Sequence, residues 1–320
     1  MLQSIKKQTM IPNLIANAPI GMALLDGEGK TKGSIKRPEV APITQHADIS
    51  RSASIGPPRA VGKLRLRTKR AGAVTTLDRL HQSGSFKCLF PRPTSLGFEA
   101  VLLNTAGGVT GGDQFSLSAH AAKGTTMTLT TQTCERAYKA QPDQTGKLRN
   151  HLNVGPGARI NWLPQETILF NGSALDRRLN VDLAADASLL MVEPLIFGRP
   201  AMGEVLRNLR IRDRIEIRRE GRPLFMDAMT LTGDVQAHLA DPFVAGGAGA
   251  MALVVMVAAN AESHLPTLRA ALPDTGGASL IGKDVLVMRV LAEDGFALRI
   301  ILLPILKCLN QGDFPRCWMI

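Results

Sequence analysis

Three stretches of the chain place acidic or amide side chains among apolar residues and glycines. In residues 104–113, four glycines in six positions lead up to Asp113. Glycine adopts backbone conformations that other residues avoid, so this run suits either a phosphate-binding loop or a tight turn. A Walker loop continues with Lys and then Ser or Thr after its last glycine, whereas Asp113 at that point would repel a phosphate. The run therefore favours a tight turn between buried strands.

The second stretch, residues 162–172, is apolar except near its middle. Gln165 and Glu166 lie there, within what the sequence predicts to be a strand. An ionised carboxylate in an apolar strand is unfavourable unless it is paired or hydrogen-bonded. Glu166 is therefore either neutralised by a structural arginine or used by the function of the protein, and both interpretations stay open.

The third stretch, residues 192–204, combines Glu193, Arg199 and Glu204 with apolar residues and glycines. Arginine binds carboxylates through a planar pair of donors. We therefore expect Arg199 to form a structural ion pair with one of the two acids.

Sequence motifs of common catalytic and metal sites do not occur. The chain lacks G-x-S-x-G and H-E-x-x-H, and its six histidines are isolated from one another in sequence. Its four cysteines form no C-x-x-C pair, so the sequence signals neither a disulfide framework nor a structural zinc site. Reduced thiols in the cytoplasm are the simplest interpretation.

The elements that must position these residues are short strands. Residues 61–68 alternate basic and apolar side chains, which is the period of a half-buried strand. Helical spacing is confined to residues 260–272, and one or two further turns are expected at residues 135–140. These patterns predict an all-β sandwich or a wound sheet. Further strands are expected at residues 98–103, 115–121, 125–131, 148–154, 158–163, 179–183, 188–195, 210–218, 224–231 and 285–291.

The chain divides into two parts by composition. Gly, Pro, Ser and Lys punctuate residues 1–60, and no periodic apolar pattern persists there. Such a segment cannot bury enough apolar surface to offset its chain entropy. We expect residues 1–60 to be a flexible N-terminal extension and residues 61–320 to form the β domain.

The net charge of +11 suits a nucleic acid, an anionic surface or an acidic protein partner. The basic residues are dispersed along predicted strands at alternating spacing, which is typical of a solvated sheet face. With one Tyr and two Trp the chain has few rings for stacking on bases, so we expect no nucleic-acid partner. No apolar run reaches the length of about 20 residues that a membrane span needs, and we expect no membrane partner.

The three stretches together resemble one protein family. N-T-A-G-G-V-T-G-G-D at residues 104–113 is followed by T-L-T-T-Q-T-C-E-R-A-Y-K-A, W-L-P-Q-E-T-I-L-F-N-G-S and F-G-R-P-A-M-G-E. In this order they are similar to the urease accessory proteins called UreD or UreH. The similarity extends from about Val61 to the P-R-C-W of residues 315–318.

The resemblance implies a mainly β fold with helically wound, stacked strands and a few α-helices. It also implies a water-filled internal route along which nickel passes. Oxygen donors bind Ni(II) more weakly than imidazole or thiolate, so an oxygen-lined route would pass the ion on. Cys134 is a candidate thiolate ligand, although a lone buried cysteine more often behaves as a small apolar residue. The residues expected to line the route are Asn104, Thr110, Asp113, Gln165, Glu166, Glu193 and Glu204.

The resemblance further implies a cytoplasmic assembly factor that is not an enzyme. Its expected partners are apo-urease, a UreF-like protein and, through that protein, a UreG-like GTPase. Transient Ni(II) is expected, with no tightly bound cofactor. The alternative is an enzyme that uses the glycine-rich loop, with Asp113 or Glu166 as acid or base.

Overall fold

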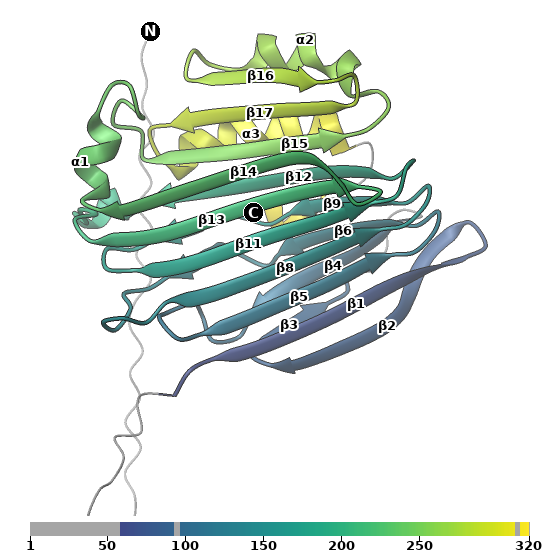
Figure 1. The fold of residues 1–320 in the computed structure, drawn as a ribbon, viewed down its shortest axis with the longest axis horizontal. Helices are drawn as coiled ribbons and strands as arrows, with labels where there is room; N and C mark the ends of the chain where they lie inside the picture. The colour runs from purple at the N-terminus through teal and green to yellow at the C-terminus, as the bar shows by residue number, and fades with distance from the viewer. Residues whose placement is uncertain (1–57, 93–96, 311–313, 320) are drawn as a thin grey trace, which may run out of the picture. The chain divides into compact units, whose positions relative to one another are not determined.

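The computed structural model describes residues 58–92, 97–310 and 314–319, which belong to one compact unit. The expected N-terminal extension, residues 1–60, lies outside this part of the chain except for its last three residues. Two β-sheets form the body of the unit (Figure 1). The fold is mainly β with few helices, as the sequence predicts.

The first sheet has seven strands and the second has ten. In spatial order, the seven-stranded sheet consists of β14 (Arg222–Gly233), β13 (Leu209–Arg219), β11 (Ala174–Leu183), β8 (Gly146–Val154), β5 (Gln114–Ala121), β1 (Val61–Ala71) and β2 (Val74–Gly84). The ten-stranded sheet consists of β16 (Gly276–Ile281), β17 (Val285–Ala292), β15 (Ala250–Val257), β12 (Ser188–Phe197), β9 (Arg159–Leu163), β6 (Thr126–Thr131), β4 (Phe98–Asn104) and β3 (Phe86–Leu89). Off this order, β10 (Thr167–Leu169) pairs with β12, and β7 (Glu135–Ala137) pairs with β10.

The chain winds between the two sheets. It passes from β4 to β5, from β6 to β8, from β9 to β11 and from β12 to β13, so each coil adds one strand to each sheet. Strands that successive coils add to one sheet are therefore parallel, as the pairs β5 with β8 and β6 with β9 show, whereas the hairpin β13–β14 is antiparallel. The helically wound, stacked sheets implied by the resemblance are confirmed.

Alternation of side chains builds the core between the sheets. In β1, Leu64 and Leu66 are buried while Lys63, Arg65 and Arg67 are exposed. A strand directs successive side chains to opposite faces, so the basic residues cover a solvated face, as expected. The inner face of the ten-stranded sheet contributes residues such as Ile160 and Leu189 to the same core.

Helices cover the other face of the ten-stranded sheet. The expected helix at residues 260–272 is confirmed as α2 (Ala261–Ala271), and α3 (Gly295–Asn310) packs on the same sheet together with Trp318 (Figure 1). A shorter helix, α1 (Val235–Ala240), follows β14, and two 3-10 turns lie at Pro200–Met202 and Arg316–Met319. None of the helices in the described ranges is long and apolar enough to cross a membrane.

Two local expectations are wrong. The helical turns expected at residues 135–140 are absent, because Glu135–Ala137 forms strand β7 and pairs in parallel with β10. Pairing with a distant strand overrides the local preference here. Gln165 and Glu166 do not lie inside a strand either, since they fall in the break between β9 and β10.

Candidate functional site

A cavity of about 190 Å³ lies between the two sheets. Side chains of β5, β8 and β11 line it from the seven-stranded sheet, and side chains of β4, β9 and β12 line it from the ten-stranded sheet. The segment from Thr131 to Arg136 forms another part of its wall. The polar residues that line this space are Asn104, Thr131, Gln132, Thr133, Cys134, Glu135, Arg136, Asn150, Gln165, Thr167, Arg177 and Glu193.

A buried arginine with two carboxylates dominates the wall of the cavity. Arg177 and Asp213 are directly paired residues of β11 and β13 and occupy inward positions of those strands. Arg177 Nε donates to Asp213 Oδ1 at 3.0 Å, and Arg177 Nη1 donates to Glu193 Oε2 at 2.7 Å. Trp162 Nε1 donates to the second oxygen of Glu193 at 2.6 Å. The packing of this group holds the Glu193 carboxylate at the cavity.

The charges of this group do not balance. Burial alone lowers the pKa of Arg177, but the carboxylates of Asp213 and Glu193 raise it, so the guanidinium stays charged. Burial raises the pKa of Glu193, and the charge of Arg177 opposes that rise. One guanidinium faces two carboxylates, so the group is one positive charge short when both acids are ionised. A cation or a proton at the cavity would restore neutrality.

Glu135 adds a third acid to the cavity wall. Its carboxylate accepts a hydrogen bond from Asn104 Nδ2 at 3.1 Å and another from the amide of Arg136 at 2.9 Å. Burial nevertheless raises the pKa of Glu135, and the charge of Asp113 adds to the rise. Asn104 also bonds the carbonyl of Gly108, which fixes the amide that faces Glu135.

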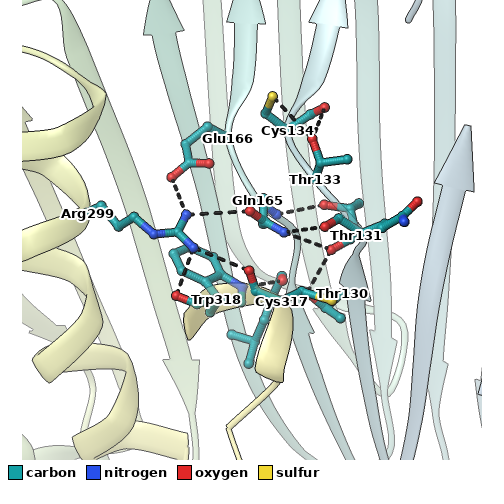
Figure 2. Close-up of polar contacts among 11 residues, drawn as sticks. Thr130, Thr131, Thr133, Cys134, Gln165, Glu166, Arg299, Cys317 and Trp318 are labelled. Carbon is teal, nitrogen blue, oxygen red and sulfur yellow. Dashed lines mark hydrogen bonds and ion pairs between the residues drawn. The ribbon is translucent and has the colours of Figure 1, made fainter. Parts of the chain in front are cut away.

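Gln165 closes the wall beside Thr131. Its side-chain amide donates to the carbonyls of Thr131 and Gln132 at 3.1 and 2.9 Å, and its backbone amide donates to Thr131 Oγ1 at 2.9 Å. Figure 2 shows Cys134 and Thr133 on the neighbouring segment, where Thr133 Oγ1 lies 3.5 Å from Cys134 Sγ. Cys134 is half-buried and not in a disulfide.

Glu166 does not line the cavity, although its neighbour Gln165 does. Arg299 of α3 reaches toward both residues, and Arg299 Nη1 lies 3.1 Å from Glu166 Oε1 (Figure 2). Arginine thus neutralises Glu166, which is the structural one of the two interpretations left open by the sequence.

Asp113 and Thr110 also lie apart from the cavity and hold the glycine-rich loop. The two oxygens of Asp113 accept hydrogen bonds from the amides of Ala60 and Thr110, both at 2.8 Å. Thr110 Oγ1 donates to the carbonyl of Lys139. A Cβ at Gly111 would lie 2.8 Å from the Ala140 Cβ, so glycine is required where the loop packs on the chain after β7.

Glu204 lies outside the cavity and is held by Arg199. Arg199 Nε donates to Glu204 Oε2 at 2.9 Å, and the amide of Asn171 donates to Glu204 Oε1. The hydrogen bond from Arg199 lowers the pKa of Glu204. The guanidinium also stacks on Phe170, 3.9 Å from the ring centre.

The structure therefore divides the residues singled out from the sequence. Asn104, Cys134, Gln165 and Glu193 meet at one cavity, whereas Thr110, Asp113, Glu166 and Glu204 do not line it. Sequence reasoning missed Glu135, Arg177 and Asp213 as members of the site. The sequence did contain a sign that Arg177 and Asp213 are buried, because each occupies a position that alternation assigns to the inward face of its strand. Arg177 lies between the inward residues Leu175 and Leu179, and Asp213 lies between the inward residues Ile211 and Ile215.

The donors at the cavity are carboxylate and amide oxygens with one thiol. Within residues 58–92, 97–310 and 314–319, no group of three or more His, Cys, Asp or Glu side chains is arranged to hold a metal ion. Scattered oxygen donors of this kind contact a cation without enclosing it.

Comparisons with known proteins identify the family of this chain. Residues 60–319 match the family model described as UreD urease accessory protein. The chain belongs to the UreD family. Two relatives, both named urease accessory protein UreD, are similar over most of this chain. The one from Ruegeria pomeroyi is 63% identical over 257 residues, which are 80% of this chain and 100% of the relative. The one from Roseobacter denitrificans is 49% identical over 261 residues, 82% of this chain and 95% of the relative.

The UreD match covers every described strand and helix of the chain, because it runs from residue 60 to residue 319. It therefore includes the whole cavity. Residues 1–59 lie outside the match.

Proposed function

We propose that this chain assists the maturation of urease by giving nickel a passage through the cavity between its sheets. The observation that carries the proposal is the excess of acid at the cavity wall, where Arg177 faces both Glu193 and Asp213, and Glu135 adds a third acid against one further cation, Arg136. Nickel is the cargo in this proposal, and the chain keeps no resident metal.

The donor chemistry favours passage over storage. Carboxylate oxygens are weaker ligands for Ni(II) than imidazole or thiolate, so Glu135 would contact the ion and release it, with Asn104 and Gln165 beside it in the wall. Burial raises the pKa of Glu135, so its proton or a cation stabilises the site. Cys134 provides one stronger ligand at the wall and would slow the ion there.

The same proposal includes the partners of this chain and its location in the cell. It would act in the cytoplasm as a scaffold that binds apo-urease and a UreF-like protein, with a UreG-like GTPase joining through the latter. A catalytic role has less support, because the candidate acid and base do not face a common space. Asp113 is bonded to two backbone amides and Glu166 to Arg299, and neither lines the cavity.

The test is a Glu135→Gln variant co-expressed with urease and its other accessory proteins. Glutamine keeps the size of the side chain and an acceptor for Asn104 but removes the charge that nickel would meet. We expect purified urease to contain several-fold less nickel and to be correspondingly less active, while the complex with the partners still forms. Metal analysis, urease activity and size-exclusion chromatography measure these three outcomes.

A matched control separates this effect from a general loss of charge. Glu262 is an exposed carboxylate in the first turn of α2, remote from the cavity lining. Glu262→Gln should leave urease nickel at the wild-type level. Equal nickel loading by Glu135→Gln and Glu262→Gln would rule out a role for Glu135 in passage, and loss of the complex by Glu135→Gln would reassign it to assembly.

A further inference from the structure

The outer face of the seven-stranded sheet carries a concentration of positive charge. On β8, β11 and β13, alternate residues point away from the core. At one end of these strands the outward positions hold six cations, which we call the basic patch. The basic patch consists of Lys147, Arg149, Arg178, Arg210, Arg212 and Arg214.

The strand register brings these cations together in rows. Arg149, Arg178 and Arg214 are directly paired positions on three neighbouring strands, which lie about 4.8 Å apart. Lys147, Asp176 and Arg212 form the adjacent row. Since these spacings are shorter than the Debye length of about 8 Å at physiological salt, the cations repel one another.

Among the residues that the structure describes, one acid lies between the six cations. Asp176 accepts from Arg149 Nη2 at 2.7 Å and lies 3.6 Å from Arg178 Nε. The remaining four members, Lys147, Arg210, Arg212 and Arg214, have no carboxylate within 4.0 Å among the residues that the structure describes.

The other end of β8, β11 and β13 is closer to charge balance. Farther along the strands, His151 lies 2.6 Å from Asp182, and Arg218 is paired with Glu216. On these three strands the excess of positive charge therefore lies at one end, while β1 of the same sheet carries further exposed cations at Lys63, Arg65 and Arg67. Such a local excess lowers the stability of the free chain, and an anionic partner would relieve it.

The basic patch surrounds a hollow of about 350 Å³ in the sheet face. Lys147, Arg210 and Arg212 line the hollow together with three threonines, Leu175, Ile211 and one acid, Asp176, so its lining carries three cations against one carboxylate. Ammonium, guanidinium and hydroxyl groups are all hydrogen-bond donors that suit a carboxylate. The hollow thus has both the charge and the donors to receive an acidic side chain.

We propose that the basic patch is a docking surface for an acidic segment of a partner protein, with a carboxylate seated between Lys147, Arg210 and Arg212. A nucleic acid fits less well, because the outward positions of β8, β11 and β13 hold no Phe, Tyr or Trp to stack on bases. An anionic membrane fits less well, because the same positions hold no apolar side chain to enter the lipid. The surface faces away from the cavity, so the proposal is independent of nickel passage.

The test compares two double variants of the full chain that change the net charge equally. Arg212→Glu with Arg214→Glu reverses two cations of the basic patch. Lys283→Glu with Lys307→Glu reverses two exposed cations at the turn before β17 and on α3, which are remote from the patch. Poly-L-glutamate is the acidic probe, and its binding is followed by fluorescence anisotropy at increasing NaCl.

We expect the chain and the Lys283/Lys307 variant to bind poly-L-glutamate with an affinity that falls as salt rises. The Arg212/Arg214 variant should bind at least about tenfold more weakly at low salt. Its thermal midpoint should equal or exceed that of the unchanged chain, because the repulsion is relieved. Equal weakening of both variants would overturn the proposal, since net charge alone would then explain binding. Tighter binding of duplex DNA than of poly-L-glutamate, lost in the Arg212/Arg214 variant, would reassign the surface to nucleic acid.

Discussion

The guanidinium of Arg299 connects helix α3 to Glu166, the residue that follows the cavity-lining Gln165. Arg299 Nη1 and Glu166 Oε1 are 3.1 Å apart, and Arg299 Nη2 donates to the carbonyl of Trp318 at 2.8 Å. Trp318 in turn donates its indole N–H to the carbonyl of Leu163 at 2.9 Å. One cation therefore joins α3, the C-terminal turn and the segment that carries Gln165, as Figure 2 shows.

Removing the Arg299 guanidinium should destabilise the chain. The side chains of Arg299 and Glu166 are only 19% and 12% exposed, so Arg299→Met leaves a largely buried carboxylate and a carbonyl without their donor. We expect the free energy of unfolding to fall by about 2 to 3 kcal/mol. Urea denaturation measures this change.

The double variant Arg299→Met with Glu166→Leu is the control for that interpretation. Removing both charges should restore part of the lost stability, because a buried pair can be replaced by apolar groups at little cost. A double variant that is less stable than Arg299→Met alone would show that the bonds of Arg299 to the C-terminal carbonyls dominate.

The buried group around Arg177 should respond differently to loss of its cation and loss of an acid. Arg177→Met leaves Glu193 and Asp213 facing each other without a counter-charge, and we expect a loss of more than about 3 kcal/mol. Glu193→Gln removes the surplus charge, keeps an acceptor for Trp162 and should cost less. Thermal unfolding of the two variants shows which one loses more stability. If Arg177→Met proved more stable than Glu193→Gln, the count of one cation against two acids would be contradicted.

Sequence periodicity predicted most strands, because one face of each sheet is solvated and the alternation is visible, as in residues 61–68. It missed α3, whose run of Leu and Ile residues is apolar on nearly every side and has no clear helical period. It also missed β7, because that strand exists through its pairing with β10 and has little local signal. Contacts between distant segments decide such elements.

The site was predictable only as a set of unusual residues. Acids in apolar surroundings marked Glu193 and Glu166 equally, yet the first lines the cavity and the second meets Arg299. The outcome depends on where α3 lies, and no motif in the sequence encodes that placement. Glu135 was overlooked because its burial depends on the loop that contains Asn104 and Gly108.

Titration of Glu135 should make the stability of the chain depend on pH. Burial raises its pKa above the ordinary value of 4.5, so the stability that this group contributes is present below pH 4.5 and is lost as pH rises through the raised pKa. Glu135→Gln removes this loss. The variant should therefore gain stability relative to the unchanged chain as pH rises, which unfolding free energies measured from about pH 4 to pH 8 would reveal.

The pH dependence of stability expected from Glu204 is opposite to that expected from Glu135. The hydrogen bond from Arg199 lowers its pKa, so its contribution is present above the ordinary value of 4.5 and is lost as pH falls through the lowered pKa. Glu204→Gln should be less stable than the unchanged chain at neutral pH, with the difference shrinking in acid. If both variants changed with pH in the same direction, the contrast between the two environments would be wrong.

Deletion of the residues before Pro58 should leave the fold and urease activation intact. The family match begins at residue 60, and the Ruegeria pomeroyi relative aligns over its whole length with 80% of this chain.

A chain starting at Lys63 is the control. It lacks the first two residues of β1 and also the amide of Ala60, which donates a hydrogen bond to Asp113. We expect the first truncation to keep its thermal midpoint and the second to lose several degrees, since one hydrogen bond to a buried carboxylate contributes about 1.5 to 3 kcal/mol. Equal midpoints for both truncations would show that Asp113 does not need Ala60, whereas failure of the first to activate urease would assign a role to the N-terminal residues.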